Sequence, residues 1–315
     1  MSENQRRIAP KKRGRKTVLF LEYYQLYIFL LPAVIYYLLF HYMPMYGITL
    51  AFRDYRFDKG MFFSPWIGVR YFESFFNYFN FWAIIRNTLT INFFKLIVYF
   101  PLPIIFALLL NEIKQNKFKQ TIQTISYLPY FISWVVTFVI IQQFLALDDG
   151  IINQIRVSMG LDKIFFLNEK SFFYPIMFLS FTWKNIGYNA IIYLASLSGI
   201  DPSLYEAARI DGAGRLRQMW HISLPGISLT AAMLFILALG SALNAGWDQI
   251  YQLRSPGNMQ ISDILDTYVI QMGLREGQFG YATAVSLFQS VIGLLLIILT
   301  NAASKKLTNS EISLF

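Results

Sequence analysis

The feature of this chain that most limits its fold is a series of long, mostly apolar stretches. A helix that crosses a bilayer needs about 20 such residues. Inside lipid every backbone polar group must find a partner, and an isolated stretch can do this only as a helix. We therefore predict an all-α integral membrane protein in which residues 24–302 form one domain of six transmembrane helices. The six stretches are Tyr24–Tyr46, Thr88–Leu110, Ile122–Leu145, Phe172–Leu197, Gly226–Ala245 and Tyr281–Ala302.

The composition agrees with a membrane protein and excludes several other classes. Of the 315 residues, 56% are hydrophobic and 14% are charged, which is too apolar for a soluble domain of this size. The chain contains no cysteine, so it has no disulfide framework, thiol nucleophile or cysteine metal site. Its two histidines, His41 and His221, are far apart and lack partners at ligand spacing, so no metal site is expected.

The chain also lacks the sequence features of an enzyme that hydrolyses ATP. A phosphate-binding loop needs glycines, a lysine and a hydroxyl residue at fixed spacing after a strand. Residues Gly14–Thr17 ("GRKT") match only the end of that pattern. No combination of a nucleophile, a base and an orienting residue is evident elsewhere. We therefore expect a non-catalytic chain that binds no cofactor of its own.

The distribution of lysine and arginine predicts the orientation in the membrane. The first apolar stretch follows a basic tail, residues 1–23, and is too long for a cleaved signal peptide. If this tail is cytoplasmic, the cytoplasmic segments hold about 15 Lys and Arg in roughly 73 residues, against about 10 in roughly 100 outside. Positive residues favour the cytoplasmic side. Six crossings then place residues 303–315 in the cytoplasm as a C-terminal tail.

A charged segment, residues 199–225, lies between the fourth and fifth apolar stretches. Asp201 is a suitable N-cap for a short helix, and Gly212 can adopt the left-handed conformation that ends one. A second helix is predicted over about Arg215–Ile222, running until Pro225. On composition alone, the segment is either a surface hairpin that caps the bundle or a docking element for a partner.

The spacing within this segment is similar to the EAA signature of ABC importer permeases. The matching residues are Glu206, Ala207, Ala208, Gly212, Ile222, Leu224 and Pro225. The resemblance implies that the segment forms coupling helices that seat in a cleft of a separate ATP-binding subunit, with Glu206 to Gly212, including Asp211, as the contact. It also implies that ATP and Mg²⁺ are used by that partner.

The resemblance covers nearly the whole chain. The segments "SYLPYFISWVV", "WKNIGYNAIIYLASLSGIDPSLYEAARIDGA" and "GSALNAGWDQIYQL" look like the carbohydrate branch of these permeases, and "DTYVIQMGL" is similar to its polysaccharide and complex-oligosaccharide subfamily. The implied architecture is a six-span type I importer permease of the maltose-permease kind in the bacterial cytoplasmic (inner) membrane. The implied partners are a homologous second permease, a dimer of ATPase subunits, and an extracytoplasmic binding protein that delivers an oligosaccharide.

Polar residues in or beside the apolar stretches are candidates for a substrate pathway, because they are costly in lipid unless they face a cavity. Trp and Tyr can stack on a sugar ring, while Asn, Asp and Gln can bind hydroxyls. Packing, gating or an interfacial aromatic belt are the alternative roles. The candidates are Lys184, Asn185, Asn189, Asn244, Trp247, Asp248, Gln249 and Tyr251.

Two lysines within apolar stretches, Lys95 and Lys184, bear on the substrate. A buried ammonium favours a carboxylate partner, so acidic oligosaccharides such as alginate or pectin fragments fit. Neutral sugars fit as well if the lysines pair within the protein, and a permease for another solute stays an alternative. A secondary transporter is disfavoured, because the stretches hold almost no Asp or Glu. A channel or scaffold would not need the docking signature.

Overall fold

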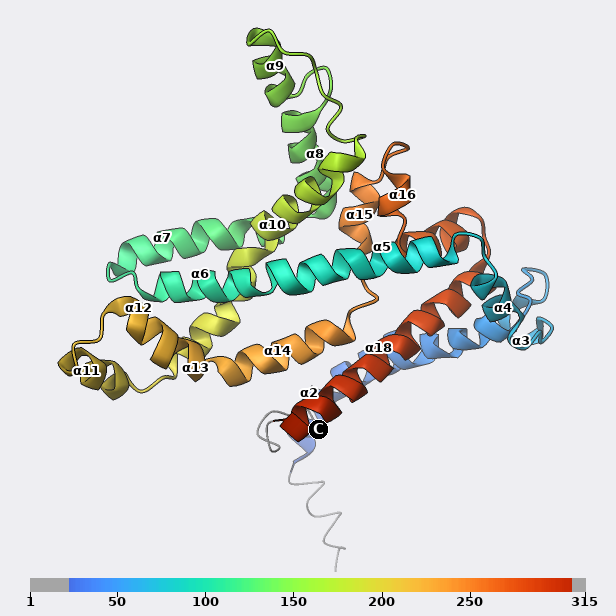
Figure 1. Cartoon of the computed structure of the whole chain (residues 1–315). Coiled ribbons are helices and arrows are strands. Elements are labelled where there is room, and N and C mark those ends of the chain that lie inside the picture. Colours follow the sequence, from blue (N-terminus) through green and yellow to red (C-terminus); the bar gives the residue numbers. More distant parts are fainter. Residues whose placement is uncertain (1–22, 308–315) are drawn as a thin grey trace, which may run out of the picture. The chain divides into compact units, whose positions relative to one another are not determined.

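The computed structural model describes residues 23–307, which are helical almost throughout (Figure 1). Most of the two predicted tails, residues 1–22 and 308–315, lies outside the described residues. The chain divides into two compact units, Met1–Thr49 and Leu50–Phe315.

The first unit contains the first predicted crossing. Its helix α2 (Tyr24–Tyr37) continues through a π-helical turn, η1 (Leu38–Tyr42), into the 3₁₀ segment η2 (Met43–Phe52), whose last residues belong to the second unit. Together they form a helical stretch of 29 residues, Tyr24–Phe52, that is long and apolar enough to cross a membrane. The predicted helix is confirmed, and it extends beyond Tyr46.

The second unit is built from helices joined by short turns, with one isolated antiparallel bridge between Arg53 and Trp66. Among its helical segments, η4 is a 3₁₀ turn, and η3, η5 and η6 are π turns. In chain order the segments are α3 (Gly60–Phe63), α4 (Arg70–Phe76), α5 (Phe81–Phe94), η3 (Lys95–Tyr99), α6 (Pro101–Asn111), α7 (Asn116–Tyr127), η4 (Leu128–Phe131), α8 (Trp134–Leu145), α9 (Ile151–Ser158), α10 (Lys170–Ser198), α11 (Pro202–Ile210), α12 (Arg215–Gln218), η5 (Met219–Ser223), α13 (Leu224–Gly226), α14 (Ser228–Gly240), α15 (Trp247–Leu253), α16 (Met259–Ser262), α17 (Leu265–Ile270), η6 (Gln271–Arg275) and α18 (Phe279–Leu307).

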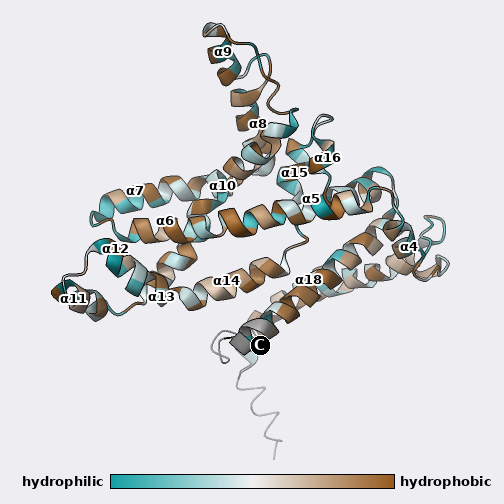
Figure 2. Cartoon of the chain, in the orientation of Figure 1, coloured by the Kyte–Doolittle hydropathy of each residue, from teal (hydrophilic) through white to brown (hydrophobic). Residues whose placement is uncertain are grey.

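Two helical stretches of this unit are also long and apolar enough to cross a membrane. One is α5, η3 and α6 in succession, Phe81–Asn111, and the other is most of α18, Phe279–Ala302. They contain the second and sixth predicted crossings, so the helices predicted there are confirmed. Figure 2 shows hydrophobic residues along α5, α6, α14 and α18.

The third predicted crossing is broken in the middle. The helical stretch Asn116–Phe131 and the helix Trp134–Leu145 are bent by 104° relative to each other. Pro129 removes a backbone donor near the break. Ser133 then starts a new helix as N-cap, because its side chain accepts the amide three residues on at 3.3 Å. The single continuous helix predicted over Ile122–Leu145 is therefore wrong.

The fifth predicted crossing is also interrupted. The helical stretches Arg215–Gly226 and Ser228–Gly240 are bent by 59° relative to each other. Residues 241–246 then form a turn in which Gly246 has a φ of +81°. The helix predicted over Gly226–Ala245 is wrong at its C-terminal end, because α14 ends at Gly240 and Ser241 leaves the helical conformation with a ψ of 13°.

The fourth predicted crossing is α10, a helix of 29 residues and therefore about 44 Å in length. It is long enough to cross a membrane, but its polar residues leave it outside the set of helices that are apolar enough. It packs against α6, α7 and α14. At Gly187 its backbone approaches that of Ser126 in α7 so closely that an added Cβ would collide. The helix is confirmed.

Buried side chains form three clusters in the second unit. The first joins α4, α5, α17 and α18 through residues such as Phe75 and Leu265, and the second joins α5, α10 and α15 around Ile91. The third joins α6, α10 and the start of α14 around Ala190. Many large apolar side chains stay exposed, among them Leu299 at 65%. Such a surface suits lipid or another subunit.

Candidate functional site

The charged segment between α10 and α14 begins with a short helix that ends in a glycine turn. The carboxylate of Asp201 caps α11 by accepting the Ser203 amide at 2.9 Å. The hydrogen bonds from the backbone and then the side chain of Ser203 hold the pKa of Asp201 below its ordinary value of 3.8. Gly212 ends the helix with a φ of +76°. Both ends of α11 agree with the sequence prediction.

The second part of the segment continues further than predicted. α12, η5 and α13 form one helical stretch from Arg215 to Gly226, which ends one residue after the predicted Pro225. Pro225 lies in the first turn of α13 directly after the π turn, and the wider turn accommodates a residue that has no amide donor. The hydroxyls of Tyr205 in α11 and Ser223 in η5 lie 2.9 Å apart and join the two parts.

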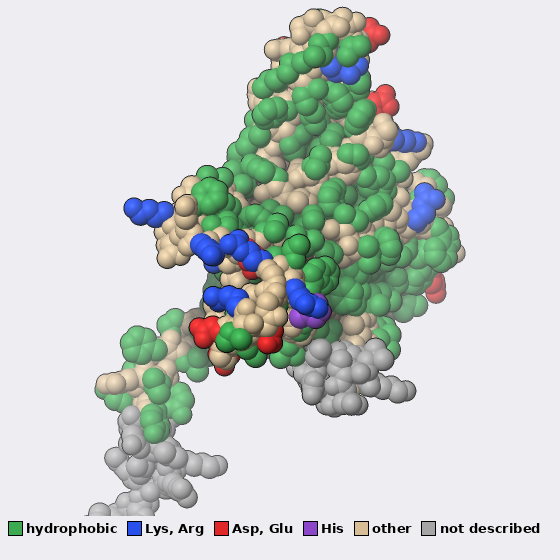
Figure 3. Space-filling view, turned by 60° about the vertical axis from the view of Figure 1, so that its left-hand side comes forward, with side chains coloured by type: hydrophobic (Ala, Val, Ile, Leu, Met, Phe, Trp, Pro, Cys, Tyr) green, Lys and Arg blue, Asp and Glu red, His purple; other side chains and the backbone are tan. Residues whose placement is uncertain are grey.

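The surface of this hairpin carries most of the signature residues. Large apolar side chains are also exposed on this surface. Ile210 is 87% exposed, Leu216 71% and Trp220 65%. Figure 3, in which the end carrying α11 and α12 is turned forward, shows Lys and Arg side chains gathered there. Exposed apolar groups among charges suit contact with another protein. The exposed signature residues are Glu206, Ala207, Gly212 and Pro225, and Asp211 between them is exposed as well; the partly buried signature residues are Ala208, Ile222 and Leu224.

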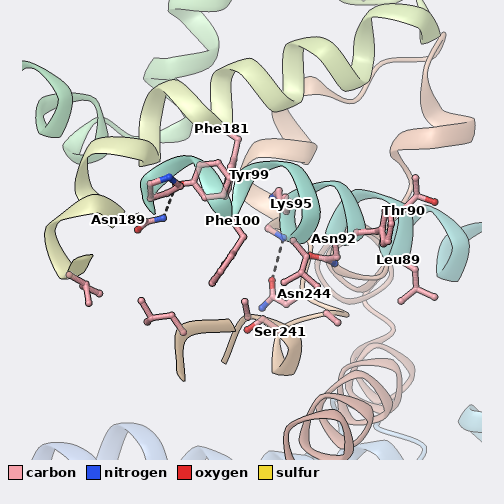
Figure 4. A pocket seen from close by; sticks show the side chains of 18 of the residues that line it. Leu89, Thr90, Asn92, Lys95, Tyr99, Phe100, Phe181, Asn189, Ser241 and Asn244 are labelled. Atoms are coloured by element: carbon pink, nitrogen blue, oxygen red, sulfur yellow. Dashed lines mark hydrogen bonds between the residues drawn. The ribbon is translucent and has the colours of Figure 1, made fainter. Parts of the chain in front are cut away.

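A cavity of about 920 Å³ lies between α5, η3 and α6 on one side and α10 and α14 on the other. This volume is at the upper end of the roughly 300–1,000 Å³ typical of small-molecule sites. Amide, hydroxyl and aromatic groups lie side by side on its walls (Figure 4). The labelled lining residues are Leu89, Thr90, Asn92, Lys95, Tyr99, Phe100, Phe181, Asn189, Ser241 and Asn244.

Lys95 is the one charged side chain among the described residues that line this cavity. It opens the π turn η3, in which the Phe100 amide donates to the Lys95 carbonyl five residues back at 3.0 Å. Pro101 and Pro103 lie two and four residues after the end of this turn, and their missing donors and bulky rings favour a widened turn before them. Turns of this kind occur often at functional sites.

The Lys95 ammonium is held by contacts from two other elements. It donates to the carbonyl of Ala245 at 2.7 Å and lies 4.1 Å from the centre of the Phe181 ring. The amide of Ala245 in turn donates to the carboxylate of Asp266 at 2.8 Å. The side chain of Gln289 donates to the same carboxylate at 2.8 Å. These contacts fix the turn after α14 beside the cavity.

Two of the predicted pathway residues, Asn189 and Asn244, line the cavity. Asn189 donates to the Tyr99 hydroxyl at 2.7 Å across the space between α10 and η3 (Figure 4). Asn185 lies outside the lining and donates to the Phe181 carbonyl of its own helix at 2.7 Å. The sequence prediction therefore placed in one group residues that the fold separates.

Lys184 also lies away from the cavity lining and is only 6% exposed. Its ammonium donates to the carbonyls of Pro129 at 3.2 Å and Tyr130 at 2.9 Å, and also to that of Ile132. These carbonyls surround the break between η4 and α8. The contacts support the alternative in which this lysine pairs within the protein.

The predicted pathway residues on α15 differ in their exposure. Gln249 is 2% exposed and donates to the Met177 carbonyl at 2.6 Å, so it ties α15 to α10. Trp247 and Asp248 are exposed.

Tyr251 on α15 contacts the side chains of Trp247 and Arg275. Its ring meets that of Trp247 edge-on, with the centroids 6.3 Å apart, and its hydroxyl accepts a hydrogen bond from Arg275. The group offers two rings and a guanidinium, which are side chains that can stack on or bind a sugar.

The lining residues that the sequence prediction missed include the polar side chains of Asn92, Tyr99 and Ser241. Asn92, Lys95 and Tyr99 are spaced by three and four residues, which places them on one face of a helix. That spacing was the available signal. Ser241 could not be found this way, because its place depends on where α14 ends.

The chain is similar to known membrane components of transport systems over most of its length. Residues 99–309 match the family model described as binding-protein-dependent transport system inner membrane component. The chain is 43% identical over 296 residues to the polygalacturonan/rhamnogalacturonan transport system permease protein YteP of Bacillus subtilis (strain 168), a match covering 94% of this chain and 92% of that protein.

Two solved structures are similar along nearly the whole fold. One is a bacterial ABC transporter involved in the import of the acidic polysaccharide alginate, with a TM-score of 0.84 and 35% identity over 94% of this chain and 100% of that one. The other is a bacterial alginate ABC transporter in complex with an alginate pentasaccharide-bound periplasmic protein, with a TM-score of 0.85 and 34% identity over 96% and 100%. The chain therefore belongs to the family of binding-protein-dependent transport system inner membrane components, the non-catalytic permease subunits of ABC transporters.

Proposed function

We propose that this permease imports oligosaccharides, acidic ones in particular, that an extracytoplasmic binding protein delivers. The observation that carries the proposal is the cavity of about 920 Å³, whose walls combine amides and hydroxyls with aromatic rings and one ammonium. Amides and hydroxyls bind sugar hydroxyls, and aromatic rings cover the apolar faces of a sugar. The similarity to a polygalacturonan/rhamnogalacturonan permease and to an alginate transporter supports the acidic class.

In this proposal the chain crosses the cytoplasmic membrane six times with both termini in the cytoplasm. The crossings are the three long apolar helices, the two bent pairs and α10. The chain pairs with a homologous second permease, and a dimer of ATPase subunits drives both with ATP and Mg²⁺. The excess of Lys and Arg on the proposed cytoplasmic side supports this orientation.

The α11–α13 hairpin is the proposed contact with the ATPase. Its exposed apolar side chains, Ile210, Leu216 and Trp220, would be covered by the cleft of that subunit. Glu206 and Asp211 would set the register through their charges. The Tyr205–Ser223 hydroxyl contact makes the two parts of the hairpin move together, so that a movement of the ATPase reaches α14.

The proposed sugar pathway runs from the Trp247 and Tyr251 rings on α15 to Asn244 and then into the cavity. Asn244 lies at the cavity wall, three residues before Trp247. Asn189 and Lys95 bind the sugar deeper in the cavity. Lys184, Asn185 and Gln249 support the helices that form its walls.

Transport by the reconstituted complex tests the proposal. The two permeases, the ATPase and the binding protein are placed in proteoliposomes with ATP inside the compartment that holds the ATPase. We expect uptake of trigalacturonate or an alginate trisaccharide that depends on ATP and on the binding protein. Uptake and ATPase stimulation by amino acids, peptides or metal ions instead of sugars would overturn the carbohydrate assignment.

A further inference from the structure

The described wall of the cavity carries positive charge and no negative charge. Lys95 brings one positive charge to its wall, and no Asp or Glu is among the described residues that line it. Three ion pairs are found among the described residues, Arg56–Asp54, Lys163–Asp148 and Arg254–Asp263, and none of them includes Lys95. An ammonium at membrane depth is costly unless an anion or several dipoles compensate it.

Asp266 and Asp248 act on Lys95 through their charges, but neither forms an ion pair with it in the described structure. Both carboxylate oxygens of Asp266 accept hydrogen bonds from uncharged donors, one from the Ala245 amide and one from the Gln289 side chain, each at 2.8 Å. Ala245 thus stands between the two charges, with its amide toward Asp266 and its carbonyl toward Lys95. Asp266 positions the turn, and the ammonium stays available on the cavity side.

The ammonium also has unused donors. A lysine has three N–H groups, and in the described structure one donates to the Ala245 carbonyl at 2.7 Å. The Phe181 ring, 4.1 Å away, covers a second side of the ammonium. Lys184 differs in this respect, because three backbone carbonyls take its donors and its side chain is buried. Of the two lysines in the apolar stretches, Lys95 is the one that can receive a ligand.

From this geometry we infer that Lys95 is the specificity-determining residue that binds a carboxylate of the transported oligosaccharide in the cavity. The inference rests on the proposed function and names the group that distinguishes acidic from neutral sugars. A uronate carboxylate would accept the free N–H groups of Lys95, while Asn92 and Asn244 bind hydroxyls beside it. A neutral sugar has no carboxylate to pair with the ammonium, so its uptake should fall little when the ammonium is removed.

The test compares one ligand pair on matched variants of the whole complex in proteoliposomes. The ligands are trigalacturonate and its fully methyl-esterified form, which differ in charge and share the sugar skeleton. Each rate is divided by the wild-type rate for the same ligand, which cancels the preference of the binding protein. In Lys95→Met, we expect trigalacturonate uptake to fall about ten- to a hundredfold, as for loss of a charged hydrogen bond, and the ester rate to stay within about twofold. Lys95→Arg keeps the charge and should retain most of the trigalacturonate uptake.

A lysine that only holds the Ala245 turn would behave differently. Equal losses for both ligands in Lys95→Met would overturn the inference, as would loss of trigalacturonate uptake in Lys95→Arg equal to that in Lys95→Met. A wild-type complex that transports neither sugar would instead overturn the proposed function.

A second measurement does not depend on variants. The wild-type complex with trigalacturonate-loaded binding protein is treated with a water-soluble carbodiimide, which joins a bound carboxylate to a neighbouring amine as an amide. Mass spectrometry should find the trisaccharide on the peptide with Lys95 and not on that with Lys184. Adducts confined to exposed lysines such as Lys117 would contradict the inference.

Discussion

The ammonium of Lys184 in α10 donates to the carbonyl of Tyr130 at 2.9 Å, at the point where the third predicted crossing breaks. The rings of Tyr130 and Tyr188 are stacked beside this contact, with their centroids 3.6 Å apart and 3° between their planes. A broken helix leaves carbonyls without intrahelical partners. Lys184 supplies donors to three of them, so one side chain of α10 stabilises a bend in its neighbour.

Replacing Lys184 by methionine should therefore destabilise the protein without changing sugar preference. The variant leaves buried carbonyls without donors, at a cost of roughly 2–3 kcal/mol. We expect a lower thermal midpoint of the purified complex and equal relative losses of trigalacturonate and ester uptake. Lys163→Met is the control, because the Lys163–Asp148 pair is exposed and should contribute about 0–1 kcal/mol. A selective loss of the acidic sugar would show that Lys184 contacts substrate after all.

Gly187→Ala should weaken the packing of α10 against α7. A Cβ at this position would lie 2.8 Å from the Cβ of Ser126 and closer still to its backbone, so the helices would have to separate. We expect a destabilisation of about 1–3 kcal/mol, seen as a lower thermal midpoint of the complex. At Gly199 the nearest atom to an added Cβ is 3.4 Å away, so Gly199→Ala serves as control. Similar midpoints for the two variants would disprove the close-packing argument.

Gly212→Val should impair coupling to the ATPase while the protein still folds. Gly212 has a φ of +76° and open space around it, so the penalty comes from the backbone alone, about 1–2 kcal/mol. We expect ATP hydrolysis stimulated by loaded binding protein to fall, and Gly212→Asn to retain more of it because asparagine tolerates this conformation.

Gly214→Val is the matched control for that experiment. Gly214 also has open space, but its φ of −68° is one that valine adopts readily. Its stimulated ATPase rate should stay near that of the wild type. If the stimulated ATPase rate of Gly212→Val equals that of Gly214→Val, the left-handed turn has no part in coupling.

The Asp201 cap predicts a response of α11 to acid. Because the folded pKa of Asp201 is below its ordinary value of 3.8, the ionised cap stabilises α11 above that value. The stabilisation is lost as the pH falls through the lower, folded pKa, so no change is expected near neutral pH. Amide hydrogen exchange of α11 should therefore accelerate, relative to its intrinsic rate, only below about pH 4. Asp201→Asn keeps an uncharged cap. It should not show this transition, and an identical acid response in that variant would assign it to another group.

Local features of the α11–α13 hairpin could be predicted because they depend on neighbouring residues. The Asp201 cap and the Gly212 turn need only a side-chain oxygen and a missing Cβ within a few residues. The breaks at Ser133 and after Gly240 could not be predicted from hydropathy, which measures apolar content and not helix continuity. A run of apolar residues looks the same whether it forms one helix or two.

By itself, the sequence determined that this is a helical membrane protein with a charged hairpin between its fourth and fifth apolar stretches, because lipid requires apolar helices and caps act locally. Only the tertiary structure decided the contacts of the two lysines in its apolar stretches. Both lie in apolar stretches, and their sequence surroundings do not distinguish them. Lys184 meets the carbonyls of a broken helix more than 50 residues away, whereas Lys95 meets the turn after α14, 150 residues away, beside a cavity. Such partners are set by how helices pack, and long-range packing leaves no mark in the local residue pattern.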